Sequence, residues 1–480
     1  MKICFLARPT FDLYSAALYK ELTKKDPGIE GVFITTNGEE SRKIIELLDG
    51  YHNIEVFETS TYLKEHWKDF NLGTLVQYEK EYDCKPIWEL IYTDRFLINR
   101  DYDYSIKVCS GLFSFYQYVY RKTHPDFYYS ECIATLQCYI GYIVGKKEGV
   151  QYITQMCARG SLDSSYHYFS MDPFEYDIDL NKNYLQTEYR KDEIKRASEY
   201  LDEFENKDLK PLATNLVNTK PKIDKNFILA PLRYLKRRAD PNLNDPYSYM
   251  YYKSYEDLLN PIRFYFRYQK LKHYCQEPDY SRKYIYFPLH YQPEATTCVC
   301  AEKYEKQLFF IDSWAKSLPA DTVLYLKEHF TLLGHRDLQF YKELRKYPNV
   351  FLVDPLEDSR KLIRNAAAVT TLAGTAGLEA MLLRKPVFLG GNAVYEDAPG
   401  IIKVTDIYGQ YVSLIEKWQK PAREDIIKYL CACFRSYYPG NIYCQNFSQL
   451  LQDNVPDIAN SLFEKLIVET GKDERTSIDV

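Results

Sequence analysis

Several features that would assign this chain to a particular protein class are missing from its sequence. No apolar run approaches the roughly 18–20 residues that a membrane-spanning helix needs. The short apolar start at 3–7 is broken by Arg8 and Pro9, which argues against a secretory signal. None of the 12 cysteines forms a Cys-x-x-Cys pair. We therefore expect reduced, buried thiols in a cytoplasmic protein, without a disulfide framework, metal site or cofactor.

An excess of charge of either sign is also missing. The 62 Lys and Arg residues nearly balance the 67 Asp and Glu residues, for a net charge of −5. Because general nucleic-acid-binding proteins are usually clearly basic, we expect no nucleic-acid partner. Tyrosine, in contrast, is abundant, with 47 residues. Its ring buries apolar area while its hydroxyl keeps a hydrogen bond, which suits sugar-binding clefts and interfaces; compositional drift in an AT-rich genome is the alternative explanation.

Three predicted strands, 284–287, 322–326 and 368–371, run into polar residues at their carboxyl ends. In a parallel α/β sheet the ligand lies outside these ends, where helix N-termini offer free N–H groups to anions. We therefore predict a site for a phosphate-bearing ligand, most simply an activated sugar. The polar residues that follow the three strands are His290, Gln292 and Glu294; Lys327, Glu328 and His329; and Gly374, Thr375, Gly377 and Glu379.

Strands and helices alternate in two stretches of the chain, which predicts parallel sheets with right-handed crossovers. The charged and aromatic segment between them lacks this alternation. We expect an α/β, GT-B-like fold in which two Rossmann-like parallel-sheet domains face a cleft, with a helical insertion. The predicted units are an acceptor-side domain at 1–159, the insertion or bridge at 160–282, a nucleotide-sugar-binding domain at 283–407 and a helical tail at 408–480.

The segments 286–297, 326–329 and 374–380, followed by Lys385-Pro386-Val387, resemble the bacterial capsule polysaccharide biosynthesis glycosyltransferases, a GT-B family related to the β-Kdo transferases. The resemblance implies an inverting, metal-independent transferase. Its nucleotide-sugar donor would be a CMP-linked acidic sugar such as Kdo or sialic acid, and its acceptor a capsular or surface glycan, free or lipid-linked. One departure is Phe330, which stands where the family has proline. Proline would fix the backbone, so the change is either neutral or marks an altered donor or weakened activity.

The resemblance also assigns roles to individual residues. His329 would contact the nucleotide phosphate, where an imidazolium stabilises the leaving group; a structural histidine is the alternative. Gly374, Thr375 and Gly377 would form a phosphate site at a helix N-terminus, and Glu379 would accept a hydrogen bond from a ribose hydroxyl. A plain helix start is the alternative there. We expect further donor contacts from Lys327 and Glu328. From His290, Gln292 and Glu294 we expect either donor contacts or only a rigid interdomain loop.

For the catalytic base we look to the first domain. Glu131 follows the predicted strand 126–130, at a carboxyl end that would face the cleft. A carboxylate there would take the proton of the acceptor hydroxyl during an inverting displacement. Asp94 and Asp163 are the other candidates for the base. The alternative without a catalytic role is that Glu131 is only a solvated surface residue. The two Asp-x-Asp sequences, at 101–103 and 177–179, lie outside the strand pattern, in keeping with metal independence.

Two clusters of basic residues lie in the predicted helical insertion. They would dock on anionic lipid or hold a lipid-linked glycan, which leaves peripheral contact with the inner face of the cytoplasmic membrane open; a solvated helix face is the alternative. Two other functions remain open as well: a UDP-sugar 2-epimerase of the same fold and a non-catalytic glycan-binding or assembly protein. The clusters are Arg233, Lys236, Arg237 and Arg238, then Arg263, Arg267, Lys270 and Lys272 interleaved with Phe264, Tyr265, Phe266 and Tyr268.

Overall fold

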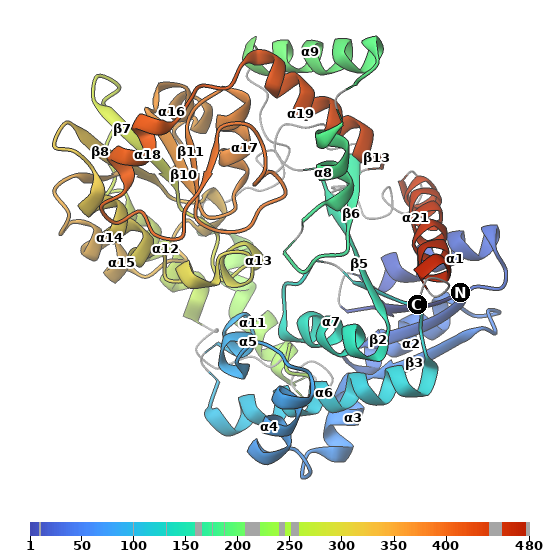
Figure 1. The fold of residues 1–480 in the computed structure, drawn as a ribbon. Coiled ribbons are helices and arrows are strands. Elements are labelled where there is room, and N and C mark those ends of the chain that lie inside the picture. The colour runs from blue at the N-terminus through green and yellow to red at the C-terminus, as the bar shows by residue number, and fades with distance from the viewer. Residues whose placement is uncertain are drawn as a thin grey trace.

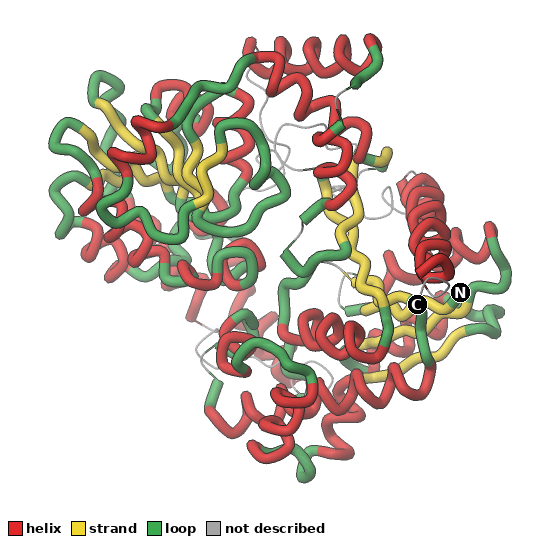
Figure 2. Tube along the Cα trace, viewed as in Figure 1, coloured by secondary structure: helices red, strands yellow, loops and turns green. Residues whose placement is uncertain are grey.

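The structure is a computed structural model, and two α/β domains make up most of it (Figure 1). The strands of each domain lie together, with helices outside them (Figure 2). The predicted α/β fold class with two Rossmann-like domains, a GT-B-like fold, is confirmed. The described residues are 1–8, 11–98, 100–130, 132–158, 166–174, 176–186, 188–206, 221–239, 245–250, 259–440 and 454–476.

The first sheet has seven strands in the order β13-β6-β5-β4-β1-β2-β3. β1 to β5 pair in parallel, whereas β6 is antiparallel to β5 and β13 is antiparallel to β6. β6 falls in the range that we predicted as a helical insertion, so that range contributes a strand to this sheet. The strands are β1 Lys2–Leu6, β2 Glu30–Thr35, β3 Ile54–Glu58, β4 Phe127–Ser130, β5 Gln151–Cys157, β6 Tyr166–Ser170 and β13 Tyr438–Pro439.

Four helices, α3 to α6, follow β3. α6 begins where the Asp101 side chain accepts a hydrogen bond from the N–H of Tyr104, at 2.8 Å. The first Asp-x-Asp sequence therefore starts a helix, which needs such an acceptor for its free N–H groups. The helices of this domain are α1 Asp12–Lys25, α2 Gly38–Leu47, α3 Thr59–His66, α4 Leu72–Glu81, α5 Ile87–Tyr92, α6 Tyr102–Thr123 and α7 Leu136–Glu148.

The second sheet has six parallel strands in the order β12-β11-β10-β7-β8-β9. In this doubly wound order the chain reverses direction across the sheet between β7 and β10, and ligands bind at such a switch point. The strands are β7 Lys283–Pro288, β8 Thr322–Lys327, β9 Val350–Val353, β10 Ala368–Thr371, β11 Val387–Leu389 and β12 Ile401–Lys403.

Short helices surround the second sheet. The strands between them are buried on both faces, as a parallel sheet covered by helices requires. The α-helices are α13 Ala295–Cys298, α14 Gln307–Ser317, α15 Leu338–Leu344, α16 Ser359–Asn365, α17 Thr375–Leu382 and α18 Tyr411–Lys417, and the 3₁₀ turns are η2 Glu302–Tyr304 and η3 Phe330–Leu332.

The remaining helices lie in the chain between β6 and β7 and after α18. α19 packs against α8 and α9, and the C-terminal helix α21 returns to the first domain, where it packs along α1 (Figure 1). The Asp177 side chain accepts from the first N–H groups of α8, so the second Asp-x-Asp sequence also starts a helix. These helices are α8 Ile178–Leu185, α9 Lys191–Asn206, α11 Lys225–Ala239, α12 Asn260–Leu271, α19 Arg423–Ser436 and α21 Val455–Thr476.

Candidate functional site

The loop that follows β7 is held by a buried glutamine on α14. Gln307 accepts from the N–H of His290 at 2.9 Å and donates to the carbonyl oxygen of His290 at 3.2 Å. Its amide also donates to Oε1 of Gln292 at 3.1 Å, and the amide of Gln292 donates to the carbonyl oxygen of Glu305. The Gln292 amide thus has its partners within the protein and acts to fix the loop.

A buried ion pair joins the ends of β7 and β8. Nε of Arg336 lies 2.9 Å from Oε2 of Glu328, and the Glu328 side chain has no exposed surface. The same carboxylate accepts from the Tyr341 hydroxyl at 2.6 Å and from the N–H of His329 at 2.8 Å. Nη2 of Arg336 donates to the carbonyl oxygen of His290 at 3.0 Å. Glu328 therefore positions the two strand ends, and the structure gives it no free oxygen toward the predicted ligand.

His290 lies against the turn that leads from β10 into α17. Its Nε2 accepts from the N–H of Leu372 at 3.1 Å and lies 3.1 Å from Oγ1 of Thr371. Burial lowers the pKa of His290 to about 3, with His329 and Arg336 adding to the effect. The ring is thus neutral near pH 7, and because Nε2 accepts, Nδ1 carries the proton. No described residue accepts a hydrogen bond from this Nδ1–H.

The two glycines of the turn are required by close packing with neighbouring side chains. A Cβ atom at Gly374 would lie 2.7 Å from Cε1 of His290, and one at Gly377 would lie 2.5 Å from the hydroxyl oxygen of Tyr395. That hydroxyl donates to the carbonyl oxygen of Gly374. Gly374 is the residue before the first turn of α17, where N–H groups lack intrahelical acceptors. Thr375, the first residue of the helix, is exposed.

His329 also offers an N–H that has no partner among the described residues. Its Nδ1 accepts from the N–H of Thr331 at 3.3 Å and so caps η3, which leaves the proton of a neutral ring on Nε2. Burial lowers the pKa of His329 to about 4, against the opposing effect of Glu328. In the free protein the ring is therefore neutral near pH 7. Phe330 stacks on this ring, with centroids 4.8 Å apart.

Charged groups of α16, α17 and β8 lie near one another on the same side of the sheet. Nζ of Lys327 donates to the carbonyl oxygen of Glu357 and to Oγ of Ser359, both at 2.6 Å, and burial lowers the pKa of Lys327 to about 8. Burial raises the pKa of Glu379 to about 7, although Arg360 and Lys327 lower it. No described side chain donates a hydrogen bond to the Glu379 carboxylate. The oxygens of Glu379 are therefore without a side-chain donor in the described part of the protein.

The raised pKa of Glu379 predicts a pH dependence of stability. Its pKa rises from 4.5 to about 7 on folding, so the folded protein binds the proton more tightly. The free energy of unfolding then falls as the pH rises, by about 2 kcal/mol between about pH 5 and about pH 8. His290 and His329, whose pKa values are lowered, oppose this below about pH 6.5.

Urea unfolding of the wild type and of Glu379→Gln at several pH values isolates the contribution of Glu379. Since Gln does not titrate, the variant loses this part of the slope while the histidine contributions remain in both proteins. The exposed Glu55→Gln is the control and should keep the wild-type slope. Equal slopes for the wild type and Glu379→Gln would contradict the raised pKa.

In the first domain, the predicted base Glu131 and its rival Asp163 lie outside the described residues. Asp94, the other rival, is buried. Its carboxylate accepts from the N–H groups of Phe96, Leu97 and Leu136, at 2.6, 3.0 and 2.7 Å. This carboxylate occupies the N-terminus of α7, so the helix start after β4 is closed to an anionic ligand by the protein itself.

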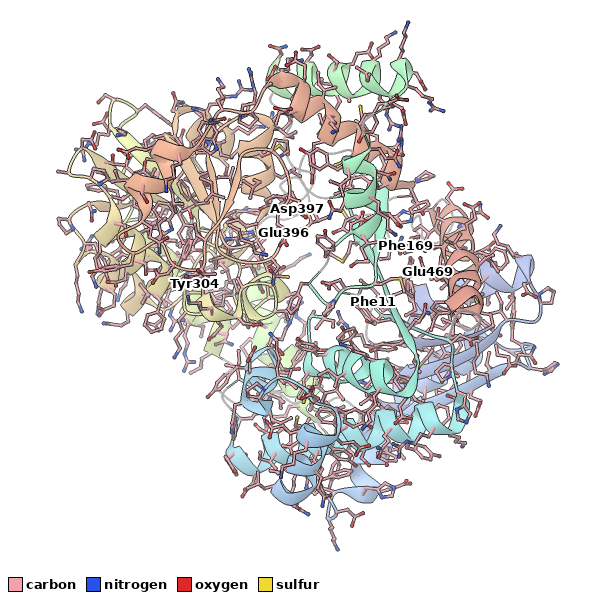
Figure 3. The ribbon with its side chains drawn as sticks, viewed as in Figure 1. Phe11, Phe169, Tyr304, Glu396, Asp397 and Glu469 are labelled. Atoms are coloured by element: carbon pink, nitrogen blue, oxygen red, sulfur yellow. The ribbon has the colours of Figure 1, made fainter. Side chains whose placement is uncertain are left out.

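Side chains link the two domains on both sides of this region. Lys85 of the first domain lies 2.6 Å from Glu302 of the second, and Val299 packs into the core of the first domain. Asp397 lies on the side of the second domain that faces β6 and α8 (Figure 3). The hydroxyl of Tyr176 donates to its Oδ2 at 3.2 Å. These contacts join the second domain to the first domain and to the segment of β6 and α8.

The structure thus brings His290, His329 and the start of α17 together, with Lys327 and Glu379 beside them. Their exposed or unpartnered groups are two imidazole N–H donors, the free N–H groups of a helix and one carboxylate, which suit a ligand that combines a phosphate and a hydroxyl. The sequence reasoning missed the residues that position this set, because nothing local marks a partner that is distant in sequence; they are Gln307, Arg336, Tyr341, Ser359 and Tyr395. In the described part of the chain no group of His, Cys, Asp and Glu side chains is placed to hold a metal ion.

Comparison with known proteins gives a family match for the second domain. Residues 281–425 match the family described as capsule polysaccharide biosynthesis protein. No curated protein matches the chain.

Solved structures align over most of the chain at low similarity. The UDP-GlcNAc 2-epimerase of Methanocaldococcus jannaschii is 13% identical over 91% of this chain and 100% of its own, with a TM-score of 0.25. The β-Kdo 2,7 transferase KpsC of Thermosulfurimonas dismutans is 12% identical over 74% of this chain and 89% of its own, with a TM-score of 0.32. Its β-Kdo 2,4 transferase is 11% identical over 71% and 88%, with a TM-score of 0.36. Such low similarity does not distinguish a transferase from an epimerase. The similarity to the family of capsule polysaccharide biosynthesis proteins thus covers the segment 281–425, which holds the second sheet and the candidate site.

Proposed function

We propose that the chain is a glycosyltransferase that moves a sugar from a nucleotide-sugar donor onto a capsular or surface polysaccharide. The observation that supports this most is the set of free donors at the carboxyl ends of β7, β8 and β10, within the matched segment. His290 Nδ1–H, His329 Nε2–H and the start of α17 would hold the phosphate. Glu379 would accept from a ribose hydroxyl.

The donor that we propose is a CMP-linked acidic sugar, such as Kdo or sialic acid, and the acceptor is a glycan or lipid-linked glycan. The reaction would be inverting and independent of metal. In it, the neutral His329 would donate its Nε2–H to a phosphate oxygen. The negative charge that develops on the phosphate as the leaving group forms would strengthen this hydrogen bond, with the proton remaining on Nε2.

Incubation of the protein with CMP-sugars and UDP-sugars, each with and without acceptor glycan, tests this proposal. Transfer only in the presence of acceptor, unchanged by a chelator, is the expected result. Conversion of a UDP-sugar without acceptor would show a 2-epimerase instead. Glycan binding with no turnover of any donor would show a non-catalytic assembly protein.

His329→Ala is expected to lower kcat/KM by about 10- to 100-fold, because one hydrogen bond to a charged group contributes about 1.5–3 kcal/mol. Steady-state kinetics measure the loss, and circular dichroism verifies the fold. The matched control is His52→Ala, which removes an exposed histidine in the first domain and should leave the kinetics unchanged. Wild-type kinetics for His329→Ala would remove His329 from the site.

A further inference from the structure

Helices α11 and α12 form an outer layer beside the second domain. α12 is anchored there, since Tyr268 is buried and Phe264 stacks on His335 with centroids 3.8 Å apart. Arg267 pairs with Asp337, at the start of α15. α11 packs on α12 through the rings of Phe227 and Tyr265, whose centroids are 6.2 Å apart. Part of the second basic cluster, namely Phe264, Arg267 and Tyr268, thus contacts the second domain. The other side of the helix pair faces away from the domain.

The outward side carries large apolar side chains. In α11, Ile228, Leu232 and Leu235 are spaced by four and three residues and so lie along one face of the helix. These three side chains are 68%, 63% and 50% exposed. A helix of a soluble domain normally turns such a stripe toward the core. The exposed apolar residues of this layer are Ile223, Ile228, Leu229, Leu232 and Leu235, with Ile262 and Phe266 of α12.

Basic residues flank this stripe. Lys225 precedes Ile228 by three residues and Lys236 follows Leu232 by four, so both lie beside the apolar face. Neither makes an ion pair with a described residue. The segments 221–239 and 259–272 together contain ten Lys and Arg residues and one Asp, although the chain has a net charge of −5. The positive charge is thus concentrated where the apolar side chains are exposed.

We propose that α11, with the outer face of α12, docks on the surface of a bilayer that contains anionic lipid. An apolar stripe flanked by Lys and Arg is the pattern of a helix that lies in the membrane interface, with its apolar face among the acyl chains. The long basic side chains reach the anionic headgroups from beside that face. No helix in the described part of the chain is long and apolar enough to cross a membrane. This docking does not depend on which reaction the protein catalyses.

Sedimentation with vesicles tests the docking without any enzyme assay. Vesicles of phosphatidylcholine with phosphatidylglycerol should bind the full chain, and phosphatidylcholine alone should bind it much less. Lys225→Gln with Lys236→Gln should weaken binding to the anionic vesicles about 30-fold, at about fivefold for each basic residue. Leu232→Ser with Leu235→Ser should weaken it by at least about 10-fold. Added salt should weaken wild-type binding.

Matched controls change similar residues elsewhere. Leu185→Ser removes a side chain that is 72% exposed on α8, and Lys64→Gln removes an exposed lysine of α3. Both should bind the vesicles like the wild type, and circular dichroism should show all variants folded. Equal binding by the α11 variants and the controls would overturn the proposal. Sedimentation velocity without lipid gives a second check: self-association that the leucine variants abolish, with no vesicle binding, would assign this face to a second copy of the chain.

Discussion

Arg336→Met is expected to lower the free energy of unfolding by about 3–5 kcal/mol, because it leaves the Glu328 carboxylate buried without its cation. The Glu328 side chain has no exposed surface and that of Arg336 is 10% exposed. Taking a carboxylate out of water is tolerated only while Arg336 and Tyr341 compensate it. The same substitution removes the donor to the His290 carbonyl oxygen. Urea unfolding followed by fluorescence measures the loss.

Two further variants separate the buried charge from other effects of this substitution. Combining Arg336→Met with Glu328→Gln removes both charges and should recover much of the lost stability. Arg267→Met, at the more exposed pair with Asp337, should cost below about 1 kcal/mol. If Arg336→Met and Arg267→Met unfolded at the same urea concentration, the buried pair would not hold the strand ends as described. Nucleotide affinity should fall with Arg336→Met and stay unchanged with Arg267→Met.

The second large effect concerns the proposed base. Glu131→Gln is expected to lower kcat by on the order of 10²–10⁴-fold, the usual contribution of a general base. Gln keeps the size of the side chain but cannot take the proton of the acceptor hydroxyl. Donor binding should be unchanged, since the proposed donor site lies in the second domain. Single-turnover kinetics with saturating donor measure this loss, and isothermal titration measures donor affinity.

Asp94→Asn is the matched control in the same domain. Asp94 accepts three backbone N–H groups and is buried, so this variant should lose about 1–3 kcal/mol of stability. Its kcat per folded molecule should remain that of the wild type. If Asp94→Asn instead lost kcat and Glu131→Gln did not, Glu131 would be removed as the base. The pH profile of kcat adds a readout, since only loss of the base removes the fall of activity at low pH.

The polar strand ends of the second domain show how far sequence reasoning reached. The strands β7, β8 and β10 could be predicted because apolar runs and the residues that end them are local in sequence. That these ends meet at one edge followed from parallel alternation. The sequence did not predict which of these polar residues keep free hydrogen-bonding groups. His329 keeps a free N–H, whereas the carboxylate of its neighbour Glu328 is bonded to Arg336 and Tyr341.

The packing around the two glycines of the turn was also not predicted from the sequence. We expected Gly374 and Gly377 to allow the close approach of a ligand. In the structure, Cβ atoms added at these positions would also meet the side chains of His290 and Tyr395. His290 is distant in sequence from the turn and Tyr395 lies beyond the next strand, so no local sequence pattern identifies either partner. β6 was missed for a related reason, since a short antiparallel strand is defined by pairing with β5 and not by its own alternation.

The sequence by itself therefore determined the α/β class, the two sheet domains and the polar strand ends, because each depends on the apolar pattern of a few neighbouring residues. Only the tertiary structure decided which polar side chains are consumed within the protein and which keep free hydrogen-bonding groups. It also decided that the apolar stripe of α11 faces outward. These outcomes depend on contacts between residues far apart in the chain, where burial and pairing set both the pKa and the orientation of each group.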